Sequence, residues 1–309
     1  MTSNAAQAPL SLSRQSPRWG ERITMGFLAG AASLSVLVTV GIVLALLLPA
    51  LEFFKEVSVW EFLTGTRWTP RFTGQESYGV LPLVTGTAFT TVIALLIAVP
   101  FGLGAAVFLS EYASPKMRKI LKPVLEVLAG IPSVVYGFFA LSFVAPYVLN
   151  DLLHIDVGTF SVLAAGIVLG IMIIPTIASL SEDAMSAVPA ALRQGSLALG
   201  ANRMRTTLRV VFPAAVSGIA AAVVLGLSRA IGETMIVALA AGAQKNLSFD
   251  PREGMQTMTG FIATTAGGEN AVGSTSYNTL FAVGMLLFLI TLVINVVSIA
   301  LVRRFRQEY

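Results

Sequence analysis

The sequence is dominated by apolar runs that are each long enough to cross a lipid bilayer. They lie at roughly 23–49, 82–110, 123–149, 157–181, 213–242 and 277–302. A helix needs about 20 mainly apolar residues to span the hydrocarbon core, where it satisfies its backbone hydrogen bonds internally. Only 12% of the residues are charged, against about 25% in soluble domains. The sequence therefore predicts an all-α, polytopic transmembrane helical bundle with six spans.

The first apolar run is predicted to be a retained membrane anchor. Its apolar core is about twice as long as that of a signal peptide, and no small-residue cleavage site follows it. Gly166 and Gly170 form a GxxxG pair in the fourth run, which could bring two helix backbones together. Trp60, Trp68 and Tyr78, in the first outer loop, favour an aromatic belt at the membrane surface.

Charge alternates from loop to loop along the chain. Four segments are basic, and their cationic residues are Arg14, Arg18 and Arg22, then Lys116, Arg118, Lys119 and Lys122, then Arg193, Arg203, Arg205 and Arg209, and finally Arg303, Arg304 and Arg306. The loops between them are mixed or acidic. Because cytoplasmic loops of membrane proteins are enriched in Lys and Arg, both termini are expected in the cytoplasm.

The chain lacks the common catalytic motifs. It contains no cysteine, which excludes disulfides, thiolate metal sites and thiol nucleophiles. It has no HExxH and no G-x-S-x-G sequence, and the single histidine, His154, is expected to be solvated in a short outer loop. The stretch "GENAVGST" (268–275) has the spacing of a phosphate-binding P-loop but lacks its lysine. We therefore expect no enzymatic activity and no bound cofactor, and any ATP must be bound by another chain.

Two pairs of opposite charges stand four residues apart in or beside apolar runs. Lys122 and Glu126 lie near the inner end of the third run and are expected to pair across one helical turn. Arg229 and Glu233 lie inside the fifth run and are likewise expected to share one helix face. They are interpreted either as a salt bridge between packed helices or as part of an aqueous path for an anion, for which the arginine fork is suited.

The basic loop before the fifth run is about thirty residues long, where a simple helix connection needs fewer than ten. It contains small residues at Gly195 and Ser196, and Gly200 stands where a helix could end in a left-handed cap. Two short helices bent about Gly200 would form a knob that seats in a groove of a partner protein. A merely solvated basic loop is the alternative.

This loop resembles the coupling motif of ABC-importer permeases, Glu-Ala-Ala, three residues, Gly, nine residues, Ile-x-Leu-Pro. Gln194, Gly195 and Ser196 stand at the first three positions, Gly200 falls in register, and Pro213 ends the motif. Glutamine replaces the leading glutamate, so a salt bridge made by that acid is not expected here. The resemblance implies that these five residues couple the chain to an ATPase.

Further stretches are similar to the permeases of phosphate-specific (Pst) importers, the PstC-type subunit in particular. They are "YGVLPLVTGTAFTT" (78–91), "LKPVLEVLAGIPSVVYGFFAL" (121–141), "GSLALGANRMRTTLRVVFPAA" (195–215), "GLSRAIGETM" (226–235), "NLSFDP" (246–251) and the terminal "LVRRFRQEY". The resemblance implies an ABC type I importer permease fold in a bacterial inner membrane. The expected regions are a cytoplasmic tail (1–22), a transmembrane anchor with its outer loop (23–81) and a permease core (82–309) that contains the coupling loop 182–213.

The same resemblance implies an assembly and a cargo. The chain would form half of a transmembrane heterodimer with a PstA-type permease, above a pair of PstB-type ATPase subunits that use the ATP. A PstS-type phosphate-binding protein would dock outside, lipid would surround the helices, and no nucleic acid is expected. Arg229 and Glu233 match residues that are implicated in phosphate translocation in that family. A carboxylate suits this cargo, because phosphate at neutral pH carries a proton that sulfate lacks.

Other functions agree with part of this pattern. A PstA-type subunit, or a permease for another oxyanion, would share the architecture. A self-sufficient secondary anion transporter would also have six spans, but inverted repeats would support it, and the long basic loop occurs only once. A structural membrane protein would explain the helices and leave the spacing of the coupling motif unexplained.

Overall fold

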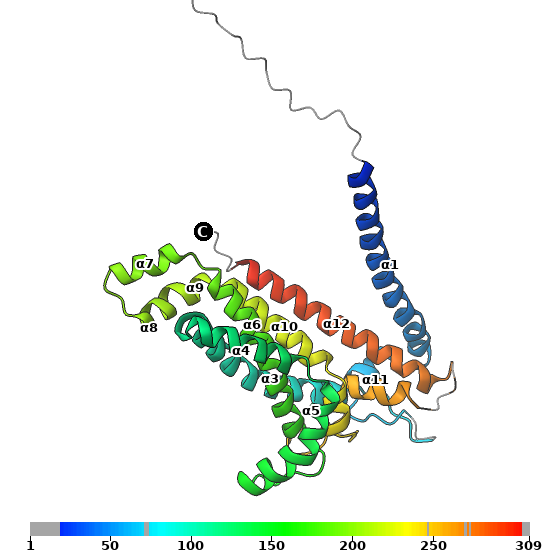
Figure 1. The fold of residues 1–309 in the computed structure, drawn as a ribbon. Helices are drawn as coiled ribbons and strands as arrows, with labels where there is room; N and C mark the ends of the chain where they lie inside the picture. Colours follow the sequence, from blue (N-terminus) through cyan, green and yellow to red (C-terminus); the bar gives the residue numbers. More distant parts are fainter. Residues whose placement is uncertain (1–18, 71–73, 246, 269–270, 272, 305–309) are drawn as a thin grey trace, which may run out of the picture. The chain divides into compact units, whose positions relative to one another are not determined.

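The computed structural model describes residues 19–70, 74–245, 247–268, 271 and 273–304. The basic residues Arg14, Arg18 and Arg306 lie outside them, as does most of the predicted cytoplasmic tail. Most of the described part of the chain is helical (Figure 1), and within it the pairing of Trp68 with Tyr78 is an isolated β-bridge and no strand forms. The predicted all-α class is confirmed.

Five described helices are long and apolar enough to cross a membrane, and a bent helix pair makes six when it is counted as one span. The five are α1 (Trp19–Glu56), α3 (Leu81–Val107) with the π-helical turn η1 (Phe108–Tyr112), α5 (Ser133–Phe139) with η2 (Ala140–Leu152), α6 (Val162–Ser186) and α12 (Thr275–Arg304). The bent pair joins Arg203–Ala214 to α10 (Val216–Gly232) at an angle of 71°. Shorter helices are α2 (Val59–Thr64) and α11 (Met258–Ala266).

The third predicted span began too early. Residues 115–129 form a separate helix, α4 (Pro115–Ala129), and the helix that is long enough to cross starts only at Ser133. The chain turns between them at Gly130 and Ile131, just before Pro132. A residue that precedes proline is disfavoured in the α conformation, which explains why the helix does not continue through Ile131.

The contacts divide the chain into two units after Ala45. Within the first unit, the described part of α1 is apolar on all sides and its side chains are almost all exposed, as at Leu34 and Val38. A helix that is hydrophobic all round is stable only when it is buried in protein or lipid. This part of α1 therefore has the character expected of a membrane anchor.

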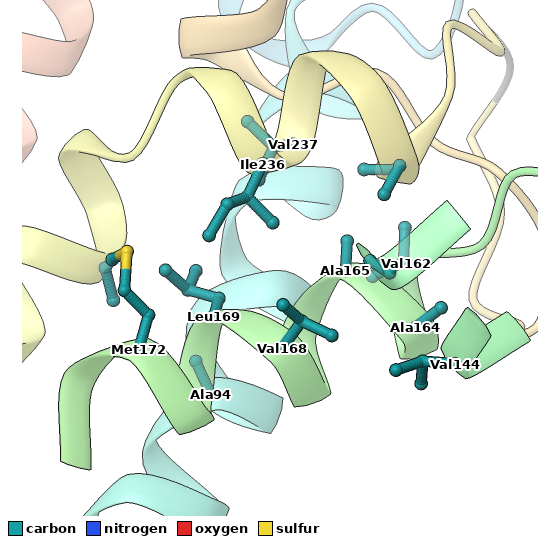
Figure 2. Packing of buried hydrophobic residues seen from close by; sticks show 14 of the residues in the cluster. Ala94, Val144, Val162, Ala164, Ala165, Val168, Leu169, Met172, Ile236 and Val237 are labelled. Carbon is teal, nitrogen blue, oxygen red and sulfur yellow. The ribbon is translucent and has the colours of Figure 1, made fainter. Parts of the chain in front are cut away.

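The core of the second unit, residues 46–309, is built on the packing of α3 against α6 (Figure 2). A β-carbon on Gly166 would lie 2.8 Å from the side chain of Ile93, and one on Gly170 would lie 2.8 Å from the carbonyl oxygen of Ala94. Only glycine permits so close an approach, so the predicted GxxxG contact is confirmed. Leu169 and Met172 of α6 fill the adjoining core.

The aromatic residues of the outer loop do not all form a belt. Trp60 is exposed, but Trp68 is fully buried and Tyr78 nearly so, in a cluster with Phe53 and Phe261. Trp68 meets the ring of Phe261 edge-on at 5.0 Å. Burial, followed by the negative charge of Glu76, raises the pKa of Tyr78 to about 12. The prediction of a belt was wrong for Trp68 and Tyr78, because tertiary packing covers them.

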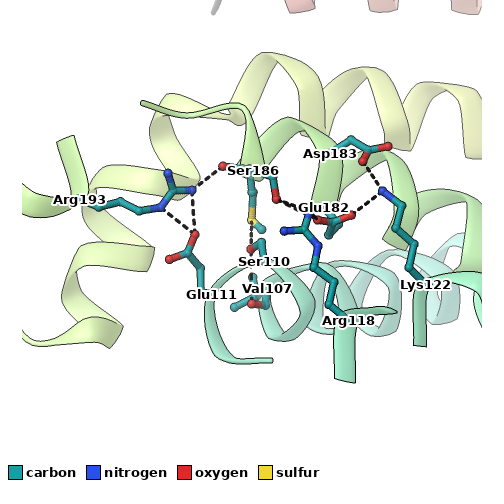
Figure 3. A network of polar contacts seen from close by, with 10 residues as sticks. Val107, Ser110, Glu111, Arg118, Lys122, Glu182, Asp183, Ser186 and Arg193 are labelled. Atoms are coloured by element: carbon teal, nitrogen blue, oxygen red, sulfur yellow. Dashed lines mark hydrogen bonds and ion pairs between the residues drawn. The ribbon is translucent and has the colours of Figure 1, made fainter. Parts of the chain in front are cut away.

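Ion pairs join α4 to the C-terminal end of α6 (Figure 3). Glu182 is fully buried and pairs with both Arg118 and Lys122, and Lys122 also pairs with Asp183. Hydrogen bonds to Asp183 and Glu182 raise the pKa of Lys122 above its usual value. The prediction of a Lys122–Glu126 pair was wrong. A buried carboxylate without a cation beside it is energetically costly, and Lys122 pairs with the buried Glu182 instead.

Candidate functional site

The fifth apolar run contains a break in the helix. α10 ends at Gly232, and Glu233 has extended backbone angles (φ −64°, ψ 132°). A short helix resumes at Met235 and continues into the π-helical turn η4 (Val237–Ala241). The expectation that Arg229 and Glu233 share one helix face was therefore wrong. The i,i+4 relation holds only within a continuous helix, and Glu233 lies beyond its end.

Glu233 caps the helix that follows the break. Its Oε1 atom accepts hydrogen bonds from the backbone N–H groups of Met235 (3.0 Å) and Ile236 (3.3 Å). The first N–H groups of a helix have no partner within it, so a carboxylate at this place stabilises the helix start. The hydroxyl of Thr259, near the start of α11, donates to the carbonyl oxygen of Glu233 at 2.6 Å. The break is thus tied to α11.

Arg229 is exposed on the surface of the single chain. Its Nη1 atom donates to the hydroxyl of Thr176 on α6 at 3.2 Å, and across the described part of the chain it pairs with no carboxylate. Arg229 lies in the last turn of α10, within an apolar run, and an arginine in such a run is unfavourable when it faces lipid. This face is consequently suited to water or to another polar surface. Residue patterns did not single out Thr176, although it is a polar residue inside an apolar run.

The long basic loop folds into short helices, as expected. α7 (Ala190–Ala198) is followed by a turn and by α8 (Arg203–Thr206), η3 (Thr207–Val211) and α9 (Phe212–Ala214). Gly200 has φ +82°, its N–H donates to the carbonyl of Leu197, and the N–H of Ala201 donates to that of Ser196. This is the Schellman pattern at a helix end. The predicted left-handed cap at Gly200 is confirmed.

Most residues of the predicted coupling motif lie on the surface of this segment. Gln194, Gly195, Gly200 and Pro213 are exposed, and Ser196 is half-buried. The hydroxyl of Ser196 forms a hydrogen bond of 2.9 Å with that of Thr206, which holds α7 against α8. α7 buries none of its residues. The structure thus brings the five motif residues into one segment whose outer surface is uncovered in the single chain.

The site offers no arrangement for a metal ion. In the ranges that the structure covers, no group of three or more His, Asp or Glu side chains could hold one. His154 is exposed and stands in a turn with φ +52°.

Comparison with known proteins finds relatives that are all named as transport-system or ABC-transporter permeases. Residues 98–308 match the family described as binding-protein-dependent transport system inner membrane component. The probable ABC transporter permease protein YqgH of Bacillus subtilis is 39% identical over 94% of this chain and 92% of its own. The phosphate transport system permease protein PstC of Haemophilus influenzae is 32% identical, over 94% of this chain and 95% of its own. PstC 1 of Mycobacterium tuberculosis is 37% identical over 79% and 81%.

Solved structures share the fold. A bacterial ABC transporter for the acidic polysaccharide alginate superposes on 94% of this chain and all of its own, with a TM-score of 0.62 and 17% identity. The inward-facing MetNI methionine ABC transporter covers 73% of this chain and 96% of its own, with a TM-score of 0.56 and 22% identity. At these identities the likeness concerns the arrangement of the helices alone, which is that of type I ABC importer permeases.

Proposed function

Because the chain belongs to the family of binding-protein-dependent transport system inner membrane components and, within it, to the PstC-type permeases, we propose that it forms half of the path by which an ATP-driven importer moves inorganic phosphate into the cytoplasm. It is a translocation subunit rather than an enzyme. It binds no cofactor, and the ATP is used by a separate subunit. The membrane is the bacterial inner membrane, with both chain termini in the cytoplasm.

The segment around Gly200 supports the assignment of the ATPase as a partner. Its surface carries Gln194, Gly195 and Gly200, and it has little side-chain bulk at the two glycines, where a β-carbon would meet no atom of this chain. Such a surface can enter a groove on another protein closely. Gln194, Gly195, Ser196, Gly200 and Pro213 are thus proposed to dock a pair of PstB-type ATPase subunits.

The observation that carries the transport function is Arg229. It is a permanent cation within an apolar run, exposed, with a hydroxyl as its hydrogen-bond partner in the single chain. Facing a path shared with a PstA-type permease, its planar guanidinium could hold two oxygens of an oxyanion. Glu233, at the helix break, could accept the proton that phosphate carries at neutral pH. A PstS-type binding protein on the outer side would deliver the anion.

Transport by the assembled complex tests this function. The chain would be co-expressed with its permease partner, ATPase and binding protein and reconstituted into liposomes that contain ATP. We expect uptake of labelled phosphate that depends on ATP and on the binding protein. A fivefold excess of unlabelled sulfate, chosen as an oxyanion without a proton, should leave this uptake unchanged. Uptake of sulfate in place of phosphate would reject the proposed cargo, and uptake without the ATPase would reject the ABC mechanism.

A further inference from the structure

α7 is attached to the rest of the chain by contacts at its surface, and none of its residues is buried. Leu192 packs at the edge of an apolar cluster that includes Ala106, Met185 and Val211. Because Leu192 is the α7 side chain that packs against this cluster, the apolar contact resists separation but does little to fix the angle of the helix. The polar contacts of α7 must supply that orientation.

Arg193 makes most of the polar contacts between α7 and the rest of the chain (Figure 3). Its Nε and Nη2 atoms donate to Oε1 of Glu111 in η1, at 3.1 and 3.0 Å. The same guanidinium donates through Nη2 to the carbonyl oxygen of Met185 in the last turn of α6, at 2.6 Å. Through Nη1 it reaches the carbonyl of Val188, at 2.5 Å. One side chain thus connects α7 with the inner ends of two spanning helices.

These contacts are well placed to hold a fixed geometry. The side chain of Glu111 is 8% exposed and that of Arg193 is 22% exposed, so the pair is largely shielded from solvent. The carbonyl of Met185, at the end of α6, also accepts a hydrogen bond from the backbone N–H of Val188 at 3.2 Å, so the guanidinium binds a helix end that is already held in place. A planar guanidinium donates in fixed directions, which a flexible ammonium does not. Beyond Met185, the inner end of α6 is itself joined to α4 through Glu182.

We propose that Arg193 is the positioning residue that transmits movement of α7 to the inner ends of α3 and α6. This inference rests on the proposed function, in which an ATPase docks on the α7 segment. When the ATPase pulls or turns α7, the guanidinium carries η1 and the end of α6 with it. Without this link, α7 would keep its hydrogen bond to α8 through Ser196 but lose its polar connection to α3 and α6, and ATP would be hydrolysed without opening the path.

The coupling ratio, phosphate imported per ATP hydrolysed, tests the proposal in the reconstituted complex. Arg193→Gln should lower this ratio by about tenfold or more, as expected when a coupling free energy of a few kcal/mol is lost, while the ATPase still co-purifies at normal yield. Glu111→Gln should lower it in the same direction. Lys116→Gln removes one charge from an exposed residue at the start of α4 and should leave the ratio unchanged.

A second readout does not depend on transport. Because the chain has no cysteine, spin labels can be placed at single introduced cysteines, at the exposed Leu199 beyond α7 and at the exposed Lys119 on α4. Pulsed distance measurements on the complex should give a narrow distribution with Arg193 present and a clearly broader one in Arg193→Gln. A merely local loss of stability would lower the melting temperature without broadening this distribution.

Each result decides the proposal. An unchanged coupling ratio in Arg193→Gln, or an unchanged distance distribution, would overturn it. Loss of the ATPase from the complex would also overturn it, since Arg193 would then hold the docking surface. If the wild-type complex imports no phosphate, the proposed function fails by itself. The distance measurement still reports whether Arg193 orients α7.

Discussion

Glu233 has one carboxylate oxygen in use and one available. Oε1 accepts both N–H groups at the start of the following helix, whereas Oε2 forms no hydrogen bond with any residue that the structure describes. Arg229 likewise uses one of its donors, toward Thr176. Each side chain thus has some polar atoms in hydrogen bonds with the protein and others that are available to bind an anion. This arrangement suits groups that must bind an anion briefly and then release it.

Glutamine substitutions of Arg229 and Glu233 can remove the charge of each side chain while keeping its hydrogen bonds. Glu233→Gln retains a carbonyl oxygen that can cap the helix at Met235 and Ile236 but removes the negative charge. Arg229→Gln retains a donor for Thr176 but removes the positive charge. We expect each variant to abolish phosphate uptake while the complex assembles and hydrolyses ATP, because the proposed path requires the two charges and the hydrogen bonds that hold the structure are retained.

Glu233→Ala is the matched comparison. It removes the cap as well, and loss of a helix cap costs about 1 kcal/mol, so its melting temperature should fall below that of Glu233→Gln. If Glu233→Gln imports phosphate at the normal rate while Glu233→Ala does not, Glu233 is a structural cap. If Arg229→Gln fails to insert or loses its partners, Arg229 holds helices together and the path assignment is wrong.

At the scale of elements, the turn between α7 and α8 has a left-handed backbone conformation at one residue. Gly200 is in the left-handed region with φ +82°, and a β-carbon there would meet no other atom of the chain. The cost of replacing it is thus conformational, about 1–2 kcal/mol for an ordinary residue, and smaller for asparagine. Any steric penalty must come from a partner that approaches this turn closely.

Gly200→Glu is expected to release the ATPase from the membrane complex. It adds bulk and charge at the point of approach and strains the turn, while the spanning helices stay intact. Gly200→Asn is the control, because asparagine tolerates the left-handed conformation, and it should retain more ATPase than Gly200→Glu does. The yield of co-purified ATPase measures both. Normal ATPase yield together with normal transport in Gly200→Glu would show that the turn does not dock the ATPase.

Features that depend on residues close together in the sequence were predicted better than features that depend on residues far apart in it. The cap at Gly200 and the GxxxG contact depend on short stretches of chain, and both were predicted from the residues alone. The break at Glu233 was missed, since an apolar run does not show where a helix is interrupted. The partner of Lys122 and the burial of Trp68 were missed as well, because they depend on residues brought together from distant parts of the chain.

At the scale of the whole molecule, the alternation of basic and non-basic segments predicts how the chain is oriented in the membrane. The basic residues Lys119 and Arg205 stand on segments that are predicted to face the cytoplasm, and both are exposed. Thr66 and His154, on the alternate segments, are exposed too. Since the cationic bias of short loops sets the topology of membrane proteins, these four positions report the orientation of the described part of the chain.

The absence of cysteine makes the orientation directly measurable. Single cysteines would be introduced by Lys119→Cys, Arg205→Cys, Thr66→Cys and His154→Cys and treated with a membrane-impermeant maleimide. In right-side-out vesicles we expect the variants at Thr66 and His154 to react, and in inside-out vesicles those at Lys119 and Arg205, because the reagent reaches only the face in contact with the medium. Prior blocking with a permeant maleimide should abolish labelling in every case, which shows that the label reacts with the introduced thiols. The reverse pattern would place the α7 segment outside the cell, where no ATPase could dock, and would reject the proposed function together with the topology.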